Sequence, residues 1–529
     1  MTTFYAMHAT ETPAAPTPLP EGERGASLPT RPLVLALALL CAGCAVGPNF
    51  HPPAAPKDAG YSSTPLAPTA SANVPGGASQ RFVPGGHLSG EWWTLFRSRP
   101  LNGLIDQALR ANPDLQAAQA SLRQANENLY AGQGSLFPVA NVSAQAAKER
   151  FSGAEFGQPG LSSTLSLATA TLNVSYVPDV FGGVRRQIES LAAQAQYQRF
   201  ELEATYLTLT SNVVNAAVQE ASLRDQIAAT RDVIRLETQQ LDLIRQQFAL
   251  GSAAKSDVLT QQATLMQTVA TLPPLEKQLA QTRDQLTALL GRFPNQQPAA
   301  RFVLDSLHLP TELPLSLPSQ LVEQRPDVRA AQATLHQASA NVGVAIANEL
   351  PQFTITGDYG REALGFANFF NPMNAVWNIG GGITQTLFDA GTLLHKKRAA
   401  VAAFNQAAAQ YRSTVIKAFQ NVADTLHALE ADADAVRAQA EADAAARASF
   451  DLAREQYRLG AITYLTLDTA ERTWQQARIG LVQAEGDRYA DTAALFQALG
   501  GGWWDRNDVA PDAIGRPDRF GISLSSKLD

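Results

Sequence analysis

The stretch NPDLQAAQASLRQANENLYAGQGSLFPVANV, residues 112–142, returns later in the chain as RPDVRAAQATLHQASANVGVAIANELPQFTI, residues 325–355. Pro326 follows Pro113 by 213 residues, and the shared Asp, Ala and Gln residues that come next keep this offset without a gap. Agreement over this length indicates an internal duplication. Its period of about 210 residues is far longer than that of a solenoid repeat, so we expect each copy to form a complete structural half.

Two Leu-Gly steps interrupt helical runs at matching places in the two copies. The first lies in RQQFALGSAAKSDVL, residues 245–259, and the second in EQYRLGAITYLTLDTAER, residues 455–472. Glycine takes up the positive φ that a chain reversal requires just past a helix C-terminus. We therefore expect each half to end in a helical hairpin. The expected tip residues are Leu250, Gly251, Leu459 and Gly460, and the expected caps of the returning helices are Ser252 or Ser256 and Thr463 or Thr466.

Each copy also contains segments with a hydrophobic period of two. The clearest are residues 352–360 and 377–384, where apolar side chains alternate with Thr, Asp, Asn or Gly. Residues 168–176 show the same alternation, and residues 139–147 are placed as a strand by their register with the second copy. A period of two gives a strand one apolar and one polar face. The chain is therefore expected to contain four such strands, two in each half.

The run that follows the second strand pair is spaced for packing of one helix on another. Apolar residues recur at intervals of three and four between Phe404 and Val436. The run from Gly391 to Gly460 would measure roughly 100 Å as an α-helix, at about 1.5 Å per residue. A rod of this length must pack laterally against other helices, and the abundant alanines permit a close approach.

Composition and motifs argue against several functions. The net charge of −7 provides no basic surface for nucleic acid. The seven histidines are scattered without ligand spacing, so we expect neither a metal nor another cofactor. The segment DVFGGV, residues 179–184, lacks the lysine and the glycine spacing of a nucleotide-binding loop. We therefore expect that the protein is not an enzyme.

The N-terminal region has the features of an export signal. Residues 32–47 are apolar but too few to span a membrane, which takes roughly 20 residues. Ala42 and Gly43 directly precede Cys44, an order similar to that of bacterial lipoproteins, in which the cysteine is acylated and becomes the mature N-terminus. A plain cleaved signal with an incidental cysteine is the alternative. Both cysteines lie in this region, which excludes a disulfide framework elsewhere.

Alternating strands in an exported chain suit a membrane barrel, with apolar side chains toward lipid and polar ones toward a water-filled lumen. Four strands are too few to close such a barrel, and an open sheet edge in lipid is prohibitive. Other copies of the chain must therefore complete it, and the residues alone leave their number open. A small soluble sheet is the alternative, but no helical segment is positioned to cover its edges.

Four features together resemble the outer membrane factors of tripartite efflux pumps, most closely the TolC/OprM-type lipoprotein branch. They are EWWTLFRSRPLNGLIDQALRANPDLQAAQASL at 91–122, the duplication, CAVGPNF at Cys44 and ALGGGW at 498–503. The resemblance implies a lipid-anchored homotrimer in the bacterial outer membrane, with a twelve-stranded β-barrel continued by a long periplasmic α-helical barrel. It also implies that the hairpin tips contact a periplasmic adaptor protein, which docks onto an inner-membrane transporter.

The resemblance further implies an outer-membrane exit channel that passes small molecules to the outside. A type I protein-secretion exit duct and a lipid-anchored structural stalk without transport are the alternatives. The stretch from Pro52 to about Gly90 is too rich in Pro, Ala, Ser and Gly to bury much apolar surface. The expected organisation is a signal peptide at 1–43, a lipid-anchored extended tether at 44–90, a first repeat at 91–300, a second repeat at 301–503 and a C-terminal tail at 504–529.

The helix that returns from the second tip is the expected place of a gate. The resemblance implies an acidic ring, a restraining arginine and a constricting leucine, and Leu465 and Arg472 fit the last two. Asp468 is one residue early, which turns its side chain by about 100° on a helix. Asp468 is therefore expected to face a neighbouring helix, with Glu471 supplying the luminal charge. Tyr464 completes the candidates, and an ordinary surface pair of Asp468 with Arg472 at i, i+4 is the alternative.

Overall fold

The computed structural model describes residues 45–506, apart from 57–59, 63–64, 153, 155–156, 158–159 and 161. These described residues belong to one compact unit, Ala45–Asp529. The predicted signal at 1–43, the predicted acylation of Cys44 and the predicted tail beyond residue 506 lie outside the described residues.

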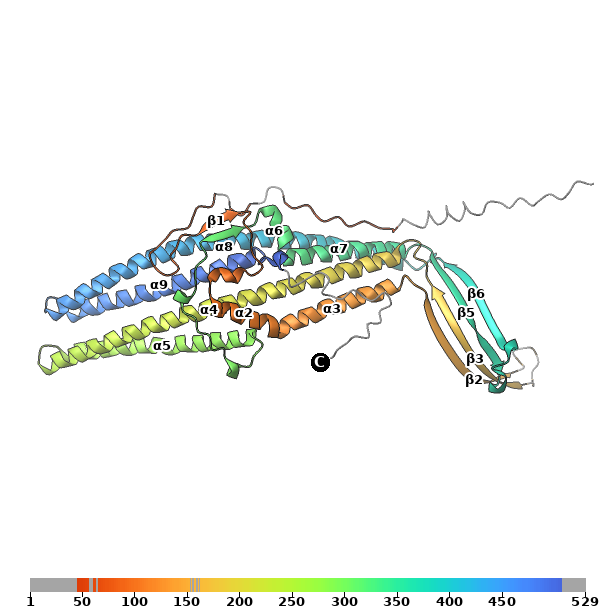
Figure 1. The fold of residues 1–529 in the computed structure, drawn as a ribbon, viewed down its shortest axis with the longest axis horizontal. Coiled ribbons are helices and arrows are strands. Elements are labelled where there is room, and N and C mark those ends of the chain that lie inside the picture. The colour runs from red at the N-terminus through yellow and green to blue at the C-terminus, as the bar shows by residue number, and fades with distance from the viewer. Residues whose placement is uncertain are drawn as a thin grey trace, which may run out of the picture. The chain divides into compact units, whose positions relative to one another are not determined.

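The chain folds as two copies of one unit, each with a helix, two strands and a long helical hairpin (Figure 1). The outgoing helices α4 and α8 have 67 residues each, and the returning helices α5 and α9 have 35 each. This repetition confirms the duplication inferred from the sequence. The first copy contains α3 (Pro113–Gly134), β2 (Val139–Ser152), β3 (Ser162–Tyr176), α4 (Gly183–Ala249) and α5 (Lys255–Leu289). The second contains α7 (Pro326–Ala347), β5 (Gln352–Leu364), β6 (Ala375–Thr384), α8 (Thr392–Arg458) and α9 (Tyr464–Ala498).

The four strands form one antiparallel sheet in the order β2-β3-β5-β6. Each copy contributes a hairpin, and the two hairpins meet through β3 and β5. Figure 1 shows the sheet at the ends of α4 and α8 that are opposite the helical tips. Strands β2 and β6 are the edges of the sheet, because no described strand pairs with their outer sides.

Both outgoing helices start in the same way, at an aspartate followed by a glycine of positive φ. The carboxylate of Asp179 accepts hydrogen bonds from the backbone N–H groups of Val184 and Arg185, each at 2.9 Å. Asp389 accepts likewise from Leu393, at 2.7 Å. A negative charge is favourable at a helix N-terminus, where backbone donors lack partners. The motifs between strand and helix are therefore helix starts.

The long helices pack along seams of apolar residues spaced by threes and fours. In α8 the buried seam runs from Tyr411 through Val422 and Leu429 to Val436, as predicted. Fully burying an apolar side chain of this size contributes about 1.5–3 kcal/mol. Lateral packing of this kind stabilises rods that could not persist alone in water.

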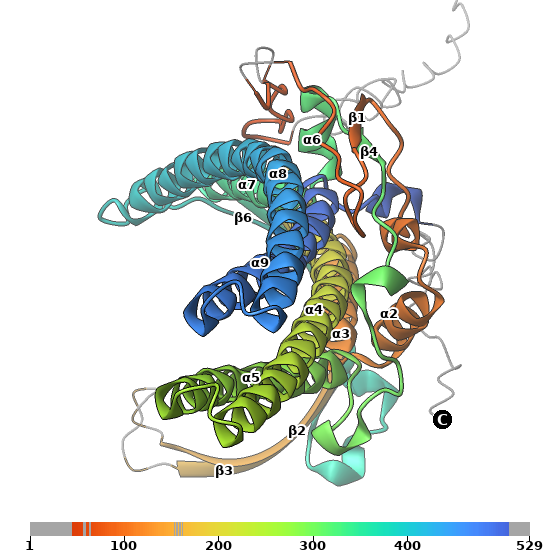
Figure 2. The same cartoon turned by 90° about the vertical axis from the view of Figure 1, so that its left-hand side faces the viewer.

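A girdle of short elements lies on one side of the long helices (Figure 2). The main core lies at its level, where Trp92, Phe96 and Phe496 are fully buried. The ring centroids of Trp92 and Phe496 are 5.5 Å apart. The girdle consists of β1 (Arg81–Pro84), α2 (Arg99–Ala111), β4 (Glu312–Leu315) and α6 (Pro318–Gln324), with β1 and β4 paired in parallel.

The expectation that residues 52–90 bury little apolar surface is wrong for their second half. Phe82 and Leu88 are buried in the main core. Gln80 is also buried, and its side-chain amide donates to the carbonyl of Pro310 at 3.0 Å. Arg488 of α9 is fully buried and donates to Thr69 Oγ1 at 3.0 Å and to the carbonyl of Ala78 at 2.8 Å. These contacts compensate for the low apolar content, which is why composition alone misjudged the segment.

Short 3-10 helices complete the secondary structure of the described chain. No helix within residues 45–506, as far as these are described, is long and apolar enough to cross a lipid bilayer. The 3-10 helices are η1 (Trp92–Phe96), η3 (Pro294–Gln296), η4 (Leu304–Ser306), η5 (Phe366–Asn368), η6 (Pro372–Asn374) and η7 (Trp503–Asp505).

Candidate functional site

The register of the four-stranded sheet aligns apolar side chains across all four strands. One row runs through Val142, Leu172, Tyr359 and Trp377. These side chains are between 44% and 78% exposed. Apolar surface gains roughly 25 cal/mol per Å² when it leaves water, and large exposed patches mark contact with another apolar phase. This face of the sheet therefore needs an apolar environment that the described chain does not supply.

The adjacent row of the same sheet is polar. It runs through Asn141, Asn173, Asp358 and Asn378. The amide of Asn173 donates to Ser143 Oγ at 3.0 Å, so the polar side chains also bond across the strands. The two rows confirm the predicted alternation, with one apolar and one polar face.

The two Leu-Gly steps form matching helix ends at the tips of the two hairpins. Gly251 has φ of 77° and Gly460 has φ of 74°. In the first tip, the N–H of Gly251 donates to Phe248 O at 3.0 Å and the next N–H donates to Gln247 O at 2.9 Å. The second tip repeats both bonds, at 2.9 Å each. Leu250 and Leu459, which precede the glycines, are 84% and 70% exposed.

The caps of the returning helices agree with the sequence prediction in one hairpin only. Thr463 is the N-cap of α9, and its hydroxyl oxygen accepts from the N–H of Thr466 at 3.4 Å. The prediction that Ser252 or Ser256 caps α5 is wrong, because Ala254 occupies the N-cap position. There the Asp257 carboxylate accepts from the Ala254 N–H at 3.2 Å. The third helical residue therefore bonds back to the cap residue, whereas the alanine has no side-chain acceptor for the N–H groups of the first helical turn.

Three of the five gate candidates meet residues of the other hairpin in a polar cluster that we call the interlock: Gln261 and Thr264 of α5 with Tyr464, Asp468 and Arg472 of α9. The Tyr464 hydroxyl donates to Gln261 Oε1. Arg472 donates to Thr264 Oγ1 at 2.6 Å, and Thr264 donates to Asp468 Oδ1 at 3.3 Å. Arg472 Nε also lies 3.0 Å from Asp468 Oδ2. The interlock therefore joins the two hairpins of one chain.

Asp468 faces the neighbouring helix α5 and is 5% exposed. Its pairing with Arg472 at i, i+4 is present, but burial distinguishes it from an ordinary surface pair. Leu465 stands apart from the interlock and is 67% exposed.

Glu471 was expected to supply the luminal charge, but it is buried, with an exposed fraction of 3%. Its placement therefore gives that expectation no support. Burial, together with the nearby carboxylates of Glu237 and Asp468, raises the pKa of Glu471 to about 8. Arg454 and Arg472 oppose this shift only in part. Glu471 therefore favours its neutral form in this packing.

Glu237 of α4 was missed by the sequence reasoning. It is fully buried, accepts from Thr268 Oγ1 at 2.8 Å, and has a pKa raised by burial and by the charge of Asp468. A signal was present, because Glu237 interrupts the otherwise apolar seam of Val233, Leu241 and Ile244. Gln261, Thr264 and Thr268 of α5 also recur at helical spacing on one face.

No group of three or more His, Cys, Asp or Glu residues within the described chain is arranged to hold a metal ion. The chemistry available at the tips is hydrogen bonding and charge pairing between helices.

A sequence model of the family described as outer membrane efflux protein matches residues 104–292 and 317–501, one match in each copy of the duplication. The pyoverdine export outer membrane protein OpmQ of Pseudomonas putida is 30% identical over 417 residues, covering 78% of this chain and 88% of that protein. The cation efflux system protein CusC of Escherichia coli strain K12 is 26% identical over 474 residues, covering 90% of this chain and all of that protein.

Solved structures are similar over the same region. The outer-membrane channel OprN superposes with a TM-score of 0.78 at 27% identity, over 87% of this chain and 100% of that one. The outer membrane protein VceC of Vibrio cholerae has a TM-score of 0.74 at 24% identity, over 79% and 100%, which shows a shared fold.

Proposed function

Because the chain belongs to the outer membrane efflux protein family, we propose that three copies of it form the outer-membrane exit channel of a tripartite efflux system. The channel receives small molecules from a periplasmic adaptor protein and an inner-membrane transporter, and it releases them outside the cell. The observation that carries the proposal is the four-stranded sheet, whose apolar rows and unpaired edges need both lipid and further strands.

The edge strands explain why several copies are required. An unpaired strand edge costs several kcal/mol for each backbone group that is left without a partner in lipid. Strand β6 of one copy and β2 of the next can pair, so three copies supply twelve strands and remove every edge. The row through Trp377 then faces lipid and the row through Asn378 lines the lumen.

The helical hairpins extend the lumen into the periplasm in this proposal. α4 and α8 leave the sheet at one end and run about 100 Å at about 1.5 Å per residue. The two repeats, at 91–300 and 301–503, each supply one hairpin to the tube. The exposed tip residues Leu250 and Leu459 are available to an adaptor protein at the far end.

The interlock is the proposed gate. It ties α9 to α5 near the tips through Asp468, Arg472 and Thr264, so the tube cannot widen there until these bonds break. Leu465 is exposed one turn before Asp468 and is free to meet its counterparts from the other copies at the axis. Several coupled contacts are needed, because one partly exposed ion pair contributes only about 0–1 kcal/mol.

We propose that Cys44 carries the lipid anchor. The contacts that fix the segment directly after it, which we call the dock, support this proposal. The N–H of Val46 donates to Phe181 O at 3.0 Å, between β3 and α4. Arg186 of α4 is 4% exposed and donates to Val46 O at 3.0 Å and to Asn49 Oδ1 at 2.7 Å. The dock holds Ala45 at the junction of strands and helices, where a barrel would meet the periplasmic face of the membrane.

The transported substrate is proposed only as a class. The names of the relatives refer to pyoverdine export, toluene efflux and cation efflux, so related channels are named for chemically different cargo. A lumen lined by Asn, Ser and Thr side chains is generic, and we expect the inner-membrane transporter to select small molecules for this chain.

Planar bilayer recording with the purified protein tests the proposal. Discrete conductance steps are expected once Asp468 and Arg472 of the interlock, together with the neighbouring Glu471, are replaced with alanine. A protein that inserts as a trimer and conducts neither before nor after this change would be a structural stalk. Deletion of the gene, followed by a panel of antibiotics, dyes and metal salts, then narrows the substrate.

A further inference from the structure

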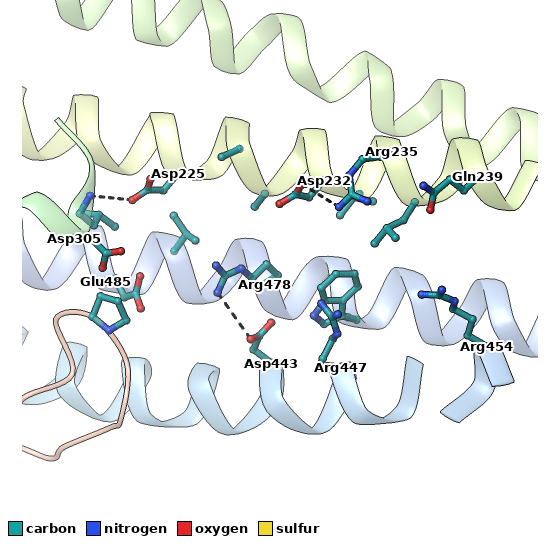
Figure 3. A pocket seen from close by; sticks show the side chains of 18 residues that line it. Asp225, Asp232, Arg235, Gln239, Asp305, Asp443, Arg447, Arg454, Arg478 and Glu485 are labelled. Atoms are coloured by element: carbon teal, nitrogen blue, oxygen red, sulfur yellow. Dashed lines mark hydrogen bonds and ion pairs between the residues drawn. The ribbon is translucent and has the colours of Figure 1, made fainter. Parts of the chain in front are cut away.

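A cavity of about 660 Å³ lies between α4, α8 and α9 (Figure 3). One end of it, which we call the girdle end, is lined by Asp305 of η4 and by Pro75 from the N-terminal segment. Asp225 and Glu485 lie at this end, whereas Arg447 and Arg454 lie toward the other. The volume is in the range of pockets that hold small organic ligands, about 300–1,000 Å³.

The girdle end of the cavity contains carboxylate oxygens without partners. Glu485 is 5% exposed, and the structure gives its side chain no hydrogen bond or ion pair with any described residue. Farther along the cavity, beside Arg478, Asp443 Oδ1 is also buried without a partner in the described chain. Buried polar groups are nearly always satisfied in folded proteins, so a buried carboxylate such as that of Glu485, without a bonded partner in this cavity, indicates a missing donor.

The neighbouring charges make the missing donor a cation. Asp225 uses Oδ2 to accept from the Leu304 N–H at 2.9 Å and keeps its other oxygen available. Burial raises the pKa of Glu485 to about 7, and the carboxylates of Asp225, Asp305 and Asp443 add to the shift. Arg478 opposes it, but it lies 4.0 Å from Asp443, at the outer limit of an ion pair.

We propose that the girdle end of this cavity binds a small organic cation with several N–H donors, such as a primary ammonium group. The group that fits must donate to the unbonded carboxylate of Glu485 and carry positive charge, because Asp225 and Asp305 line the same end of the cavity. A metal ion fits poorly, because no described cluster of acidic or histidine side chains is arranged to hold one. Hydrogen bonds to charged partners are about twice as strong as neutral ones, which favours an ammonium over a neutral donor.

The bound cation would lie between Asp225 of α4 and Glu485 of α9, so it links the two hairpins on the girdle side of the interlock. A ligand that binds the folded state alone raises its stability. The same cation competes with the proton on Glu485, so its affinity should rise as the pH increases through about 7.

Thermal unfolding of the purified trimer with 1,4-diaminobutane tests the site. The matched probe is its fully methylated bis-quaternary analogue, which has the same charge but no N–H donors, at equal ionic strength. We expect the unfolding midpoint to rise with the diamine and not with the analogue. The replacement Glu485→Gln should weaken diamine binding on the order of tenfold, a change of about 1.4 kcal/mol.

Asp434→Asn is the matched control, because Asp434 is on α8, pairs with Arg437 at the surface and does not line the cavity. It should leave diamine binding unchanged. Equal stabilisation by both probes, or an unchanged diamine affinity in Glu485→Gln, would overturn the proposal and leave the cavity filled by water. The measurement uses no transport, so its failure would leave the proposed channel function untouched.

Discussion

Arg472 and Asp468 lie one turn apart on α9 and form an ion pair of 3.0 Å, yet the arginine side chain is 46% exposed and the aspartate side chain 7%. The pair is therefore open to water on one side and sealed against α5 on the other. Its buried end meets Thr264, which both accepts from Arg472 and donates to Asp468. A contact made to the arginine from its solvent-exposed side would loosen the hairpins without entering the helix interface.

Arg472→Ala should weaken the interlock, because it leaves the buried Asp468 without its charge partner. We expect a loss of about 1–3 kcal/mol, since a buried acceptor at a partly screened pair is left unpaired. Single-channel conductance should increase in this variant. Arg437→Ala removes an exposed i, i+3 pair on α8 and serves as the control. Equal conductance of the two variants would contradict the gate assignment.

Raising the pH should loosen the same region through Glu471. Its pKa is about 8 in the folded chain and 4.5 ordinarily, so the folded state favours the protonated form. The stabilisation is complete below about pH 4.5 and is lost as the pH rises through about 8. Open probability in bilayers should therefore increase between pH 6 and pH 9. Glu471→Gln should flatten this dependence, and an unchanged pH profile would exclude Glu471 as the titrating group.

Gly460→Ala should destabilise the second tip by about 1–2 kcal/mol, because an L side chain disfavours the left-handed backbone. Nothing lies within 4 Å of the added Cβ, so the strain of φ at 74° acts alone. Gly103→Ala in α2 also meets open space, but there a helical backbone should make alanine stabilising by about 1 kcal/mol. Amide hydrogen exchange at each site distinguishes the two outcomes.

Ile379→Arg should impair membrane insertion far more than Asn378→Arg, although the two residues are neighbours on β6. Ile379 belongs to the exposed apolar face and is 78% exposed, whereas Asn378 belongs to the polar row. An arginine facing lipid at mid-membrane costs about 2–4 kcal/mol. The yield of folded trimer in outer-membrane fractions measures the difference, and similar yields would reverse the assignment of the two faces.

The sequence allowed the architecture to be predicted because its signals are periodic. The alternation of apolar and polar residues predicted the strands around Trp377 and Tyr359, and Gly251 and Gly460 predicted the hairpin tips. Both patterns depend only on the local backbone. The partners of Asp468 could not be derived in this way. Thr264 is about 200 residues distant in the chain, and the rotation of one helix against another decides which side chains meet.

The N-terminal segment shows the other limit of composition. Its few apolar residues suggested a loose tether, but a single buried arginine, Arg488, gathers Thr69, Gly76 and Ala78 through directed hydrogen bonds. Hydrogen bonds to a partner about 400 residues away in the chain cannot be inferred from the hydropathy of the segment itself.

This segment is fixed at two separate places, by Arg186 near its start and by Arg488 and the β1–β4 pairing near its end. It is therefore a mechanical tie. A force that pulls on the chain at residue 45 acts first on the contacts with Arg186 of α4. If these break, the force acts next on the contacts with Arg488 and on the β1–β4 pairing. Tension applied at residue 45 thus reaches the level where the two hairpins share their core.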